Sequence, residues 1–434
     1  MTSPAAWGEA ARVYLDRRVI AVLFLGFSSG LPLLLVFSTL SLWLKDEGIS
    51  NTMIGLFALV RTPYTFKFLW APLIDRVPVP MLGALLGRRR AWAVTTQVVL
   101  MGAILGLATA SPSLDPVMSA LFALFVAFAS ASQDIVIDAY RIEILEERQQ
   151  GAGAAMIVNG YRFGMLAAGA GAITLADTLS WPQVYAVMAG LVVVGLATVL
   201  LSPEPREPAA GGTGAAGAPP AALSTAAAWL YGAVVAPFTQ FMQRDGWVFI
   251  LLFIMLYKLG DAYLGVMANP FYVEMGFTKH EIAAVSKVFG LGATIVGGLL
   301  GGAIVYRYGI RQALLVGGVL MAASNLVFAV QAAVGHSVPM LMVTIAVENL
   351  TGGMGTAAFV AYLSSLCDVA YTATQYALLS SFMAFARDVL SASSGWLADQ
   401  VDWVAFFVIS TGLAVPGLVL LVWMTRRFPA PEES

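Results

Sequence analysis

Eleven ionisable residues interrupt the long apolar runs of this sequence. A charged side chain at membrane depth costs about 2.5–3.5 kcal/mol even on the most lenient insertion scale, so each of them calls for a reason. Cations and acids are nearly equal in number, which suggests pairing inside a shared polar cavity. The cations are Arg61, Lys67, Arg162, Lys258, Lys287 and Arg387, and the acids are Asp134, Asp138, Asp261, Glu348 and Asp388.

The spacing of these residues indicates what they could do. Asp134 and Asp138 are one helical turn apart, so both carboxylates face one side of their helix. Such a pair is suited to binding and releasing a proton near neutral pH. Lys258 and Asp261 are three residues apart and are also neighbours on one helix face. Glu348 is followed by Asn349 and then by Gly352-Gly353, where the backbone can bend or approach closely.

A structural role is the alternative for every one of these residues. Lys258 with Asp261 fits an ion pair that fixes helix register equally well, and Asp388 could simply neutralise the adjacent Arg387. Asp138 could be a hydrated helix end. A functional role is favoured for the deeper residues, which are Arg61, Lys67, Asp134, Arg162, Glu348 and Arg387.

Composition places these charges in a membrane. Of 434 residues, 59% are hydrophobic and only 11% are charged, whereas charged residues make up roughly a quarter of a soluble protein. The net charge of −2 gives no reason to expect nucleic acid. One cysteine excludes an internal disulfide, two histidines leave little for a metal site, and no phosphate-binding loop motif is present. No cofactor is therefore expected.

Windows of about 20 apolar residues predict twelve membrane-spanning helices. The first follows Arg17-Arg18 and lacks a cleavage site, so we interpret it as a retained span and not a signal peptide. The predicted spans are 18–44, 52–75, 91–111, 117–142, 151–177 and 182–201, then 246–270, 280–305, 310–333, 338–366, 371–397 and 402–425.

The spans divide the chain into three predicted parts. Residues 1–201 and 246–434 form two six-helix halves, and residues 202–245 form a cytoplasmic linker. The first part of the linker is rich in Pro, Gly and Ala, which is typical of a flexible connection. The apolar stretch 223–242 is interpreted as an interfacial helix.

Arginine and lysine predict the orientation. With both termini in the cytoplasm, fifteen arginines are assigned to the inside loops and tails, Arg141 among them. Only Lys45 and Lys279 are assigned to the outside. This asymmetry is what the positive-inside rule requires.

The two halves resemble each other. Leu175-Ala176-Asp177 with Trp181 recurs 222 residues later as Leu397-Ala398-Asp399 with Trp403, and Ala139-Tyr140 recurs at the same offset as Ala361-Tyr362. A parallel repeat of two six-helix units predicts an all-α membrane protein with the major facilitator fold. Glycine-rich stretches at 160–171, 290–302 and 352–355 favour close helix packing.

The loops after the second and eighth spans carry a related pattern. Asp75-Arg76 and Gly87-Arg88-Arg89-Arg90 resemble the loop motif of that superfamily, and the counterpart includes Tyr306-Arg307 and Gly309. Asp75, Arg76 and Arg307 are gating candidates, with topological anchoring as an equal alternative for the first two. Anchoring is favoured for Arg88 to Arg90. Because Tyr306 replaces the usual acid, any latch should be asymmetric.

Together the motifs resemble one family, the AmpG muropeptide permeases. The resemblance covers both halves and includes most of the intramembrane charges. Asp388 departs from it, because an apolar residue is expected there. The matching stretches are residues 26–32, 66–76, 131–139, 151–155 and 160–166 in the first half, and 257–262, 348–356 and 373–380 in the second.

The resemblance implies proton-driven import of N-acetylglucosaminyl-1,6-anhydro-N-acetylmuramyl peptides across the bacterial inner membrane, for peptidoglycan recycling, by a monomer. It implies a small glycopeptide substrate and membrane lipid as partners. Proton-coupling candidates are Asp134, Glu348, Asp138 and Asp261. Substrate-binding candidates are Arg61, Lys67, Gln133, Tyr161, Arg162, Tyr257, Lys258, Lys287, Asn349, Gln375 and Arg387.

Other functions remain open at this point. A proton-coupled transporter of another bulky anion, or a drug exporter, would share the fold and the intramembrane acids. So many buried cations fit an anionic substrate better than a drug. A non-transporting membrane receptor is a further alternative. An enzyme is the least favoured, because no metal cluster or nucleophile–base motif is recognisable.

Overall fold

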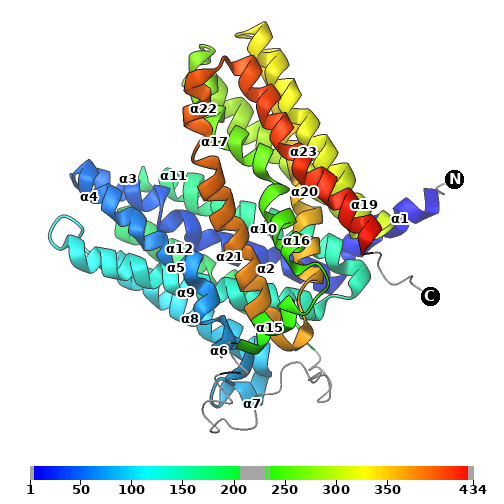
Figure 1. Cartoon of the computed structure of the whole chain (residues 1–434). Coiled ribbons are helices and arrows are strands. Elements are labelled where there is room, and N and C mark those ends of the chain that lie inside the picture. The colour runs from blue at the N-terminus through cyan, green and yellow to red at the C-terminus, as the bar shows by residue number, and fades with distance from the viewer. Residues whose placement is uncertain (1–3, 206–230, 232–234, 429–434) are drawn as a thin grey trace.

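The protein is helical throughout the part that the computed structural model describes, residues 4–205, 231 and 235–428 (Figure 1). The side chains of residues 4–6, 51, 58, 279 and 287 lie outside that description. Most of the predicted interfacial helix at 223–242 also lies outside the described residues, and only its last part is observed, as the short helix α15 (Ala236–Met242).

Most of each predicted span in the first half coincides with helical backbone. The short helix α1 and the 3-10 turn η1 precede the first of these spans. The elements are α1 (Pro4–Arg12), η1 (Val13–Leu15), α2 (Arg17–Leu35), α3 (Ser38–Asp46), α4 (Asn51–Leu56), η2 (Phe57–Arg61), α5 (Thr62–Phe66), η3 (Lys67–Leu69), α6 (Ala71–Arg76), α7 (Leu82–Leu86), α8 (Arg88–Ala108), α9 (Pro116–Ile144), η4 (Glu147–Gln149), α10 (Gln150–Leu166), η5 (Ala167–Gly171), α11 (Ala172–Ala176), α12 (Trp181–Leu191) and α13 (Val193–Leu201).

The second half follows the predicted ranges equally closely. Its elements after α15 are α16 (Trp247–Leu256), α17 (Leu259–Glu274), α18 (Lys279–Ile282), η8 (Ala283–Phe289), α19 (Gly290–Val334), α20 (Val338–Ser365), η9 (Val369–Tyr371), α21 (Thr372–Ser391), α22 (Ser394–Gln400) and α23 (Trp403–Arg427).

Long uninterrupted helices are fewer than the predicted spans. Within the described residues, seven helices are long and apolar enough to cross a membrane, or eight if the bent pair α20 and α21–α22 is added. Several predicted spans are broken into short turns, and α19 covers two of them with non-helical backbone at Gly309. The count of twelve spans and the boundaries 1–201, 202–245 and 246–434 stay predictions.

The internal repeat has a structural counterpart. Gly87, which precedes α8, and Gly309 are 222 residues apart and share an unusual backbone, with φ of 85° and 80°. Only glycine adopts such angles readily. The repeated tryptophans are also equivalent, because Trp181 donates to Asp46 at 3.0 Å and Trp403 donates to Glu274 at 2.7 Å. Each of these acids lies just after the first predicted span of its half.

Close helix packing explains the glycine-rich stretches. A Cβ atom at Gly160 would overlap the Leu23 carbonyl of α2, and one at Gly30 would overlap the Tyr161 carbonyl of α10. In the second half, Gly297 lies equally close to the backbone of Leu350 on α20. These glycines let two backbones touch, which confirms the packing role expected for the stretches at 160–171, 290–302 and 352–355.

The two ends of the molecule differ. At the end that contains α6, the start of α21 lies against α6 and η3. From there α21 runs away to α22, which lies far from α4 in Figure 1. We call these the Asp75 end and the opposite end, after the residue at the C-terminus of α6.

Candidate functional site

The predicted acidic pair is buried beside a lysine. Asp134 on α9 is 8% exposed and accepts a hydrogen bond from Ser29 of α2. The ammonium group of Lys67, which is 9% exposed, attracts the carboxylates of both Asp134 and Asp138. Asp138 also has Arg141 at 3.9 Å. The structure therefore brings two proton-coupling candidates and one substrate-binding candidate into one cluster, which we call the Lys67 cluster.

The broken second span positions Lys67. Pro63 and Pro72 fall in the first turns of α5 and α6, and a proline cannot continue the helix that precedes it. Lys67 therefore begins a separate 3-10 turn, η3. Trp70 directly after η3 donates its indole N–H to Ser132 of α9 at 3.0 Å, which holds this turn against the helix that carries the acids.

A tyrosine completes this side of the site. Tyr161 of α10 lies close enough to Asp134 and Asp138 to feel both charges, and Tyr64 of α5 is also beside it. Both hydroxyl groups therefore lie beside the charged residues of the Lys67 cluster. The location of Tyr161 next to the acids agrees with its selection as a candidate.

A second cluster joins residues from both predicted halves, and we call it the Glu348 cluster. Arg162 of α10 is attracted by Glu348 of α20 and by Asp261 of α17. Asp261 pairs with Lys258 at 3.5 Å, and Lys258 donates to the Thr356 hydroxyl at 2.8 Å. The side-chain neighbours predicted for Lys258 and Asp261 are thus confirmed.

Asn349 connects Glu348 to the neighbouring helix. Its amide N–H₂ donates to the Glu348 carboxylate, and its carbonyl oxygen accepts from Thr294 of α19 at 2.7 Å. Arg162 keeps one buried donor, Nε, without a hydrogen-bond partner among the described residues. A buried guanidinium N–H in that condition is suited to binding an anion.

Three predicted substrate-binding residues are already bonded inside the protein. Gln133 donates to the Ser28 carbonyl at 2.9 Å, and Tyr257 donates to the Leu314 carbonyl at 2.9 Å. Gln375 donates to the Pro237 carbonyl at 3.1 Å and accepts from the backbone N–H of Asp368 at 2.7 Å. The hydrogen bonds of Gln133 and Gln375 go to residues outside the two charged clusters, whereas Tyr257 lies close enough to Asp261 of the Glu348 cluster to feel its charge. Their role as substrate contacts stays a prediction.

Two further predicted cations, Arg61 and Arg387, contact residues outside the two clusters. Arg61 is exposed, with its guanidinium 4.8 Å from the centre of the Phe37 ring. Arg387 is also exposed and pairs with the adjacent Asp388 at 3.0 Å, as expected from their order in the sequence. The side chain of Lys287 is outside the described part of the structure.

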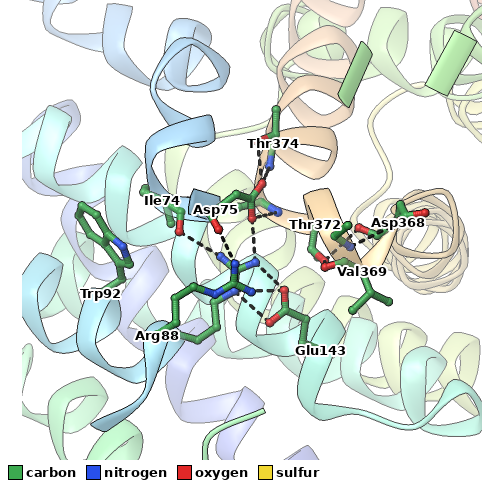
Figure 2. A network of polar contacts seen from close by, with 12 residues as sticks. Ile74, Asp75, Arg88, Trp92, Glu143, Asp368, Val369, Thr372 and Thr374 are labelled. Carbon is green, nitrogen blue, oxygen red and sulfur yellow. Dashed lines mark hydrogen bonds and ion pairs between the residues drawn. The ribbon is translucent and has the colours of Figure 1, made fainter. Parts of the chain in front are cut away.

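A buried ion network lies at the Asp75 end (Figure 2). Arg89 is 1% exposed, and its Nη2 atom is 2.7 Å from Asp75 and 2.5 Å from Glu143. Asp75 also accepts from the backbone N–H of Ala373 at 3.2 Å and from the N–H and hydroxyl of Thr374 at 2.8 and 2.6 Å. The carboxylate thus caps the first turn of α21, where the helix dipole favours a negative charge.

Further contacts surround this network. Arg88 donates to the Asp75 carbonyl, and the Arg76 guanidinium lies 5.6 Å from the centre of the Tyr371 ring. Arg141 donates to Ser364 at 3.0 Å. The assignment of Arg141 to an inside loop is wrong, because α9 continues to Ile144 and Arg141 is completely buried.

The sequence reasoning missed part of this network. Arg89 is interpreted there as a topological anchor together with its neighbours, whereas its guanidinium is buried between two acids. Glu143 and Thr374 are not among the candidates at all. The signal for Asp75 is present in the loop motif, but nothing in the sequence distinguishes Arg89 from the arginines on either side. The guanidinium group of the third gating candidate, Arg307, lies 5.4 Å from the centre of the Tyr308 ring.

Comparisons with known proteins decide the family. A model described as "Major Facilitator Superfamily" matches residues 250–434, and one described as "Acetyl-coenzyme A transporter 1" matches residues 19–114. The "Anhydromuropeptide permease" of Escherichia coli (strain K12) is 41% identical, over 95% of this chain and 80% of its own length. The chain belongs to the AmpG-type permease family. "Putative transporter AmpG 4" of Rickettsia felis is 34% identical, over 96% of this chain and 98% of its own.

Solved structures confirm the fold of this AmpG-type permease. The Escherichia coli fucose:proton symporter FucP has a TM-score of 0.66 at 11% identity, over 95% of this chain and 98% of its own. The proton:xylose symporter XylE has a TM-score of 0.65 at 12% identity, over 97% and 96%. The predicted all-α major facilitator fold is thus confirmed, and the protein is a multi-pass membrane transporter of a small molecule and not an enzyme. In the described residues no group of His, Cys, Asp and Glu could hold a metal ion.

Proposed function

We propose that this permease imports anhydro-muropeptides, N-acetylglucosaminyl-1,6-anhydro-N-acetylmuramyl peptides, by proton symport from the periplasm to the cytoplasm for peptidoglycan recycling. The observation that carries the proposal is the 41% identity with a protein named "Anhydromuropeptide permease", which extends over 95% of the chain. The protein acts as a monomer in the bacterial inner membrane. Both termini are cytoplasmic, and the Asp75 end therefore faces the cytoplasm.

The chemistry of the charged clusters supports this substrate. A muropeptide is a neutral disaccharide attached to a peptide with several carboxylates. Lys67 and Arg162 are cations within the core of the molecule, and a guanidinium binds a carboxylate by two parallel hydrogen bonds. Tyr161 and Asn349 offer hydroxyl and amide groups for sugar and peptide. A transporter of another bulky anion would use the same cations, whereas a drug exporter would leave them unused.

Proton coupling follows from the competition for Lys67. While Asp134 is ionised, Lys67 is neutralised by the acids beside it. A proton taken up from the periplasm by Asp134 removes its share of that attraction, so a substrate carboxylate then competes with Asp138 alone for the lysine. The loaded protein then closes at the opposite end and opens at the Asp75 end, where proton and substrate leave. Glu348 and Arg162 repeat the arrangement in the Glu348 cluster.

The first experiment is uptake of labelled anhydro-muropeptide into proteoliposomes, with and without an inward proton gradient. We expect uptake that requires the protein and increases with the gradient. Absence of uptake by folded, correctly oriented protein would contradict the substrate and move the search to other bulky anions. Uptake at the same rate with and without the gradient would contradict the symport mechanism but not the substrate.

Asp134→Asn tests the coupling group. The amide cannot exchange a proton, so gradient-driven accumulation should fall to the background level while exchange of substrate across the membrane without a gradient continues. Asp177→Asn, which alters an exposed acid outside both clusters, serves as the comparison for accumulation. Unchanged accumulation in Asp134→Asn would remove Asp134 from the coupling role and leave Glu348.

A further inference from the structure

Two cations and one acid stand out by their exposure within the described membrane helices. Among the described side chains of residues 17–201, Arg61 is the exposed charged residue away from the ends of the predicted spans. In residues 236–428, the corresponding exposed residues are Arg387 and Asp388, at 53% and 61%. An exposed charge at membrane depth is costly unless it faces water or an opposite charge. The network described above uses neither Arg61 nor Asp388.

The two residues lie on helices that already touch at the Asp75 end. Helix α21 lies against α6, η3 and α5, and Thr374 in its first turn is bonded to Asp75. Arg61 is the residue immediately before α5. The second span and α21 are antiparallel, because α6 is the last element of one and meets the first turn of the other. The pair Asp75–Thr374 therefore fixes the register between them.

That register places Arg61 opposite Asp388. Arg61 precedes Asp75 by fourteen residues, and Asp388 follows Thr374 by fourteen residues. At a rise of about 1.5 Å per residue both are roughly 21 Å from the contact, and the 3-10 turn η3 lengthens the first path only slightly. Fourteen residues are close to four turns, so Asp388 is near the face of α21 that carries Thr374, whereas Arg387 is on another face.

Beyond the level of Arg61 and Asp388, the second span and the helices α21 and α22 lie apart in the observed structure. The far ends α4 and α22 are widely separated in Figure 1. Exposed apolar side chains lie beyond the charged residue on each side, Leu59 of η2 at 68% and Leu56 of α4 at 55% on one and Trp396 of α22 at 67% on the other. Both sides therefore offer apolar side chains for contact beyond the level of Arg61 and Asp388.

We propose that Arg61 and Asp388 form the ion pair that closes the opposite end of the transporter when the Asp75 end opens. The inference rests on the proposed function in one respect, namely that the two ends open alternately. In the observed state Arg61 is over the Phe37 ring and Asp388 is bonded to Arg387. On closure Arg61 leaves Phe37 and approaches Asp388, whose carboxylate can accept from two guanidinium groups at once.

The single cysteine of the chain provides the readout. Cys367 follows α20, donates to the Leu363 carbonyl at 3.3 Å, and lies close enough to Asp75 and Arg141 to feel their charges. Cys367 is half-buried in the observed structure, so opening of the Asp75 end should increase the rate at which a maleimide reagent labels it. The experiment measures the rate of Cys367 labelling in proteoliposomes that contain the full chain, without any substrate.

Charge reversal with rescue is the decisive comparison. Arg61→Asp or Asp388→Arg places like charges opposite each other, which opposes closure and slows Cys367 labelling. We expect a decrease of about fivefold, which corresponds to about 1 kcal/mol. The double reversal R61D/D388R restores the pair and should return the rate to within about twofold of the unmodified protein. The matched control reverses the exposed pair Arg18–Glu146, 3.3 Å apart within one half, and should leave the rate unchanged.

A distance measurement on neutral variants tests the same ion pair if the charge-reversal variants fold poorly. Spin labels at Ser50 and Asp399, introduced in a Cys367→Ser background, should show a short-distance population that Arg61→Gln and Asp388→Asn each reduce. Two results together would overturn the ion pair. The double reversal would fail to restore the labelling rate, and the neutral variants would retain the short distance. A protein that shows the expected labelling rates but no muropeptide uptake would overturn the proposed substrate and leave the pair intact.

Discussion

At the scale of single residues, burial decides which of the many arginines matter to the fold. Arg88, Arg89 and Arg90 are consecutive, yet only Arg89 is enclosed between Asp75 and Glu143. A buried charge without its partner is costly, so each member of such a network depends on the others. Arg90 instead donates to the last carbonyls of α13.

Arg89→Ala should destabilise the protein by about 3–5 kcal/mol, because it leaves two acids buried without their cation. Equilibrium unfolding in mixed detergent micelles measures this free energy. The exposed Arg148 gives the comparison, and Arg148→Ala should change stability by less than about 0.5 kcal/mol. Equal stability of the two variants would show that Arg89 has no structural role.

At the scale of elements, small residues and breaks decide how the helices approach. Helices α2 and α10 touch through Gly30 and Gly160, where a side chain would overlap backbone atoms of the partner. This contact brings Ser29 and Tyr161 to the same side as Asp134. The broken second span adds a lysine from η3. The Lys67 cluster is therefore a consequence of helix packing as much as of residue type.

Gly160→Ala should destabilise the protein by about 1–3 kcal/mol, because its Cβ would overlap the Leu23 carbonyl and push α2 from α10. The same unfolding measurement applies. Gly102→Ala is the matched control, since nothing lies within 4 Å of a Cβ at that position of α8. Removing a glycine from an open helical site should be neutral or stabilise by up to about 1 kcal/mol. An equal loss in both variants would argue against close α2–α10 packing.

At the scale of the whole molecule, the structure is closed at the Asp75 end. The carboxylate of Asp75 connects α6 to the start of α21, and a tyrosine near the N-terminus, Tyr14, donates to Leu299 of α19 at 2.6 Å. Both contacts join the predicted halves. If the two ends open alternately, as proposed, these contacts keep the Asp75 end closed, so weakening them should favour the state in which it is open.

Asp75→Asn should raise the rate of Cys367 labelling by about tenfold, the effect of losing about 1.4 kcal/mol of contact between α6 and α21. Maleimide labelling in proteoliposomes measures it. Thr374→Val removes the hydroxyl that donates to Asp75 and should act in the same direction. Ser113→Ala, which loses a hydrogen bond to Glu47 in a loop of the first half, is the control and should not change the rate. A labelling rate in Asp75→Asn equal to that of the control would contradict a closing role for the contact.

The sequence alone determined the properties that depend on local composition. Long apolar runs located the helices, and the offset of 222 residues revealed a repeat that Gly87 and Gly309 share in their backbone. The rarity of intramembrane charges selected Lys67, Asp134 and Glu348 as candidates.

Tertiary structure alone decided which of the candidates meet. Arg162 approaches Glu348 across the predicted halves, Arg89 is enclosed while its neighbours are not, and Gln375 is consumed by internal hydrogen bonds. In the ion network around Arg89 and Asp75, bonded residues are 14 to 299 positions apart in the sequence. Periodicity and composition describe local segments and do not encode such contacts.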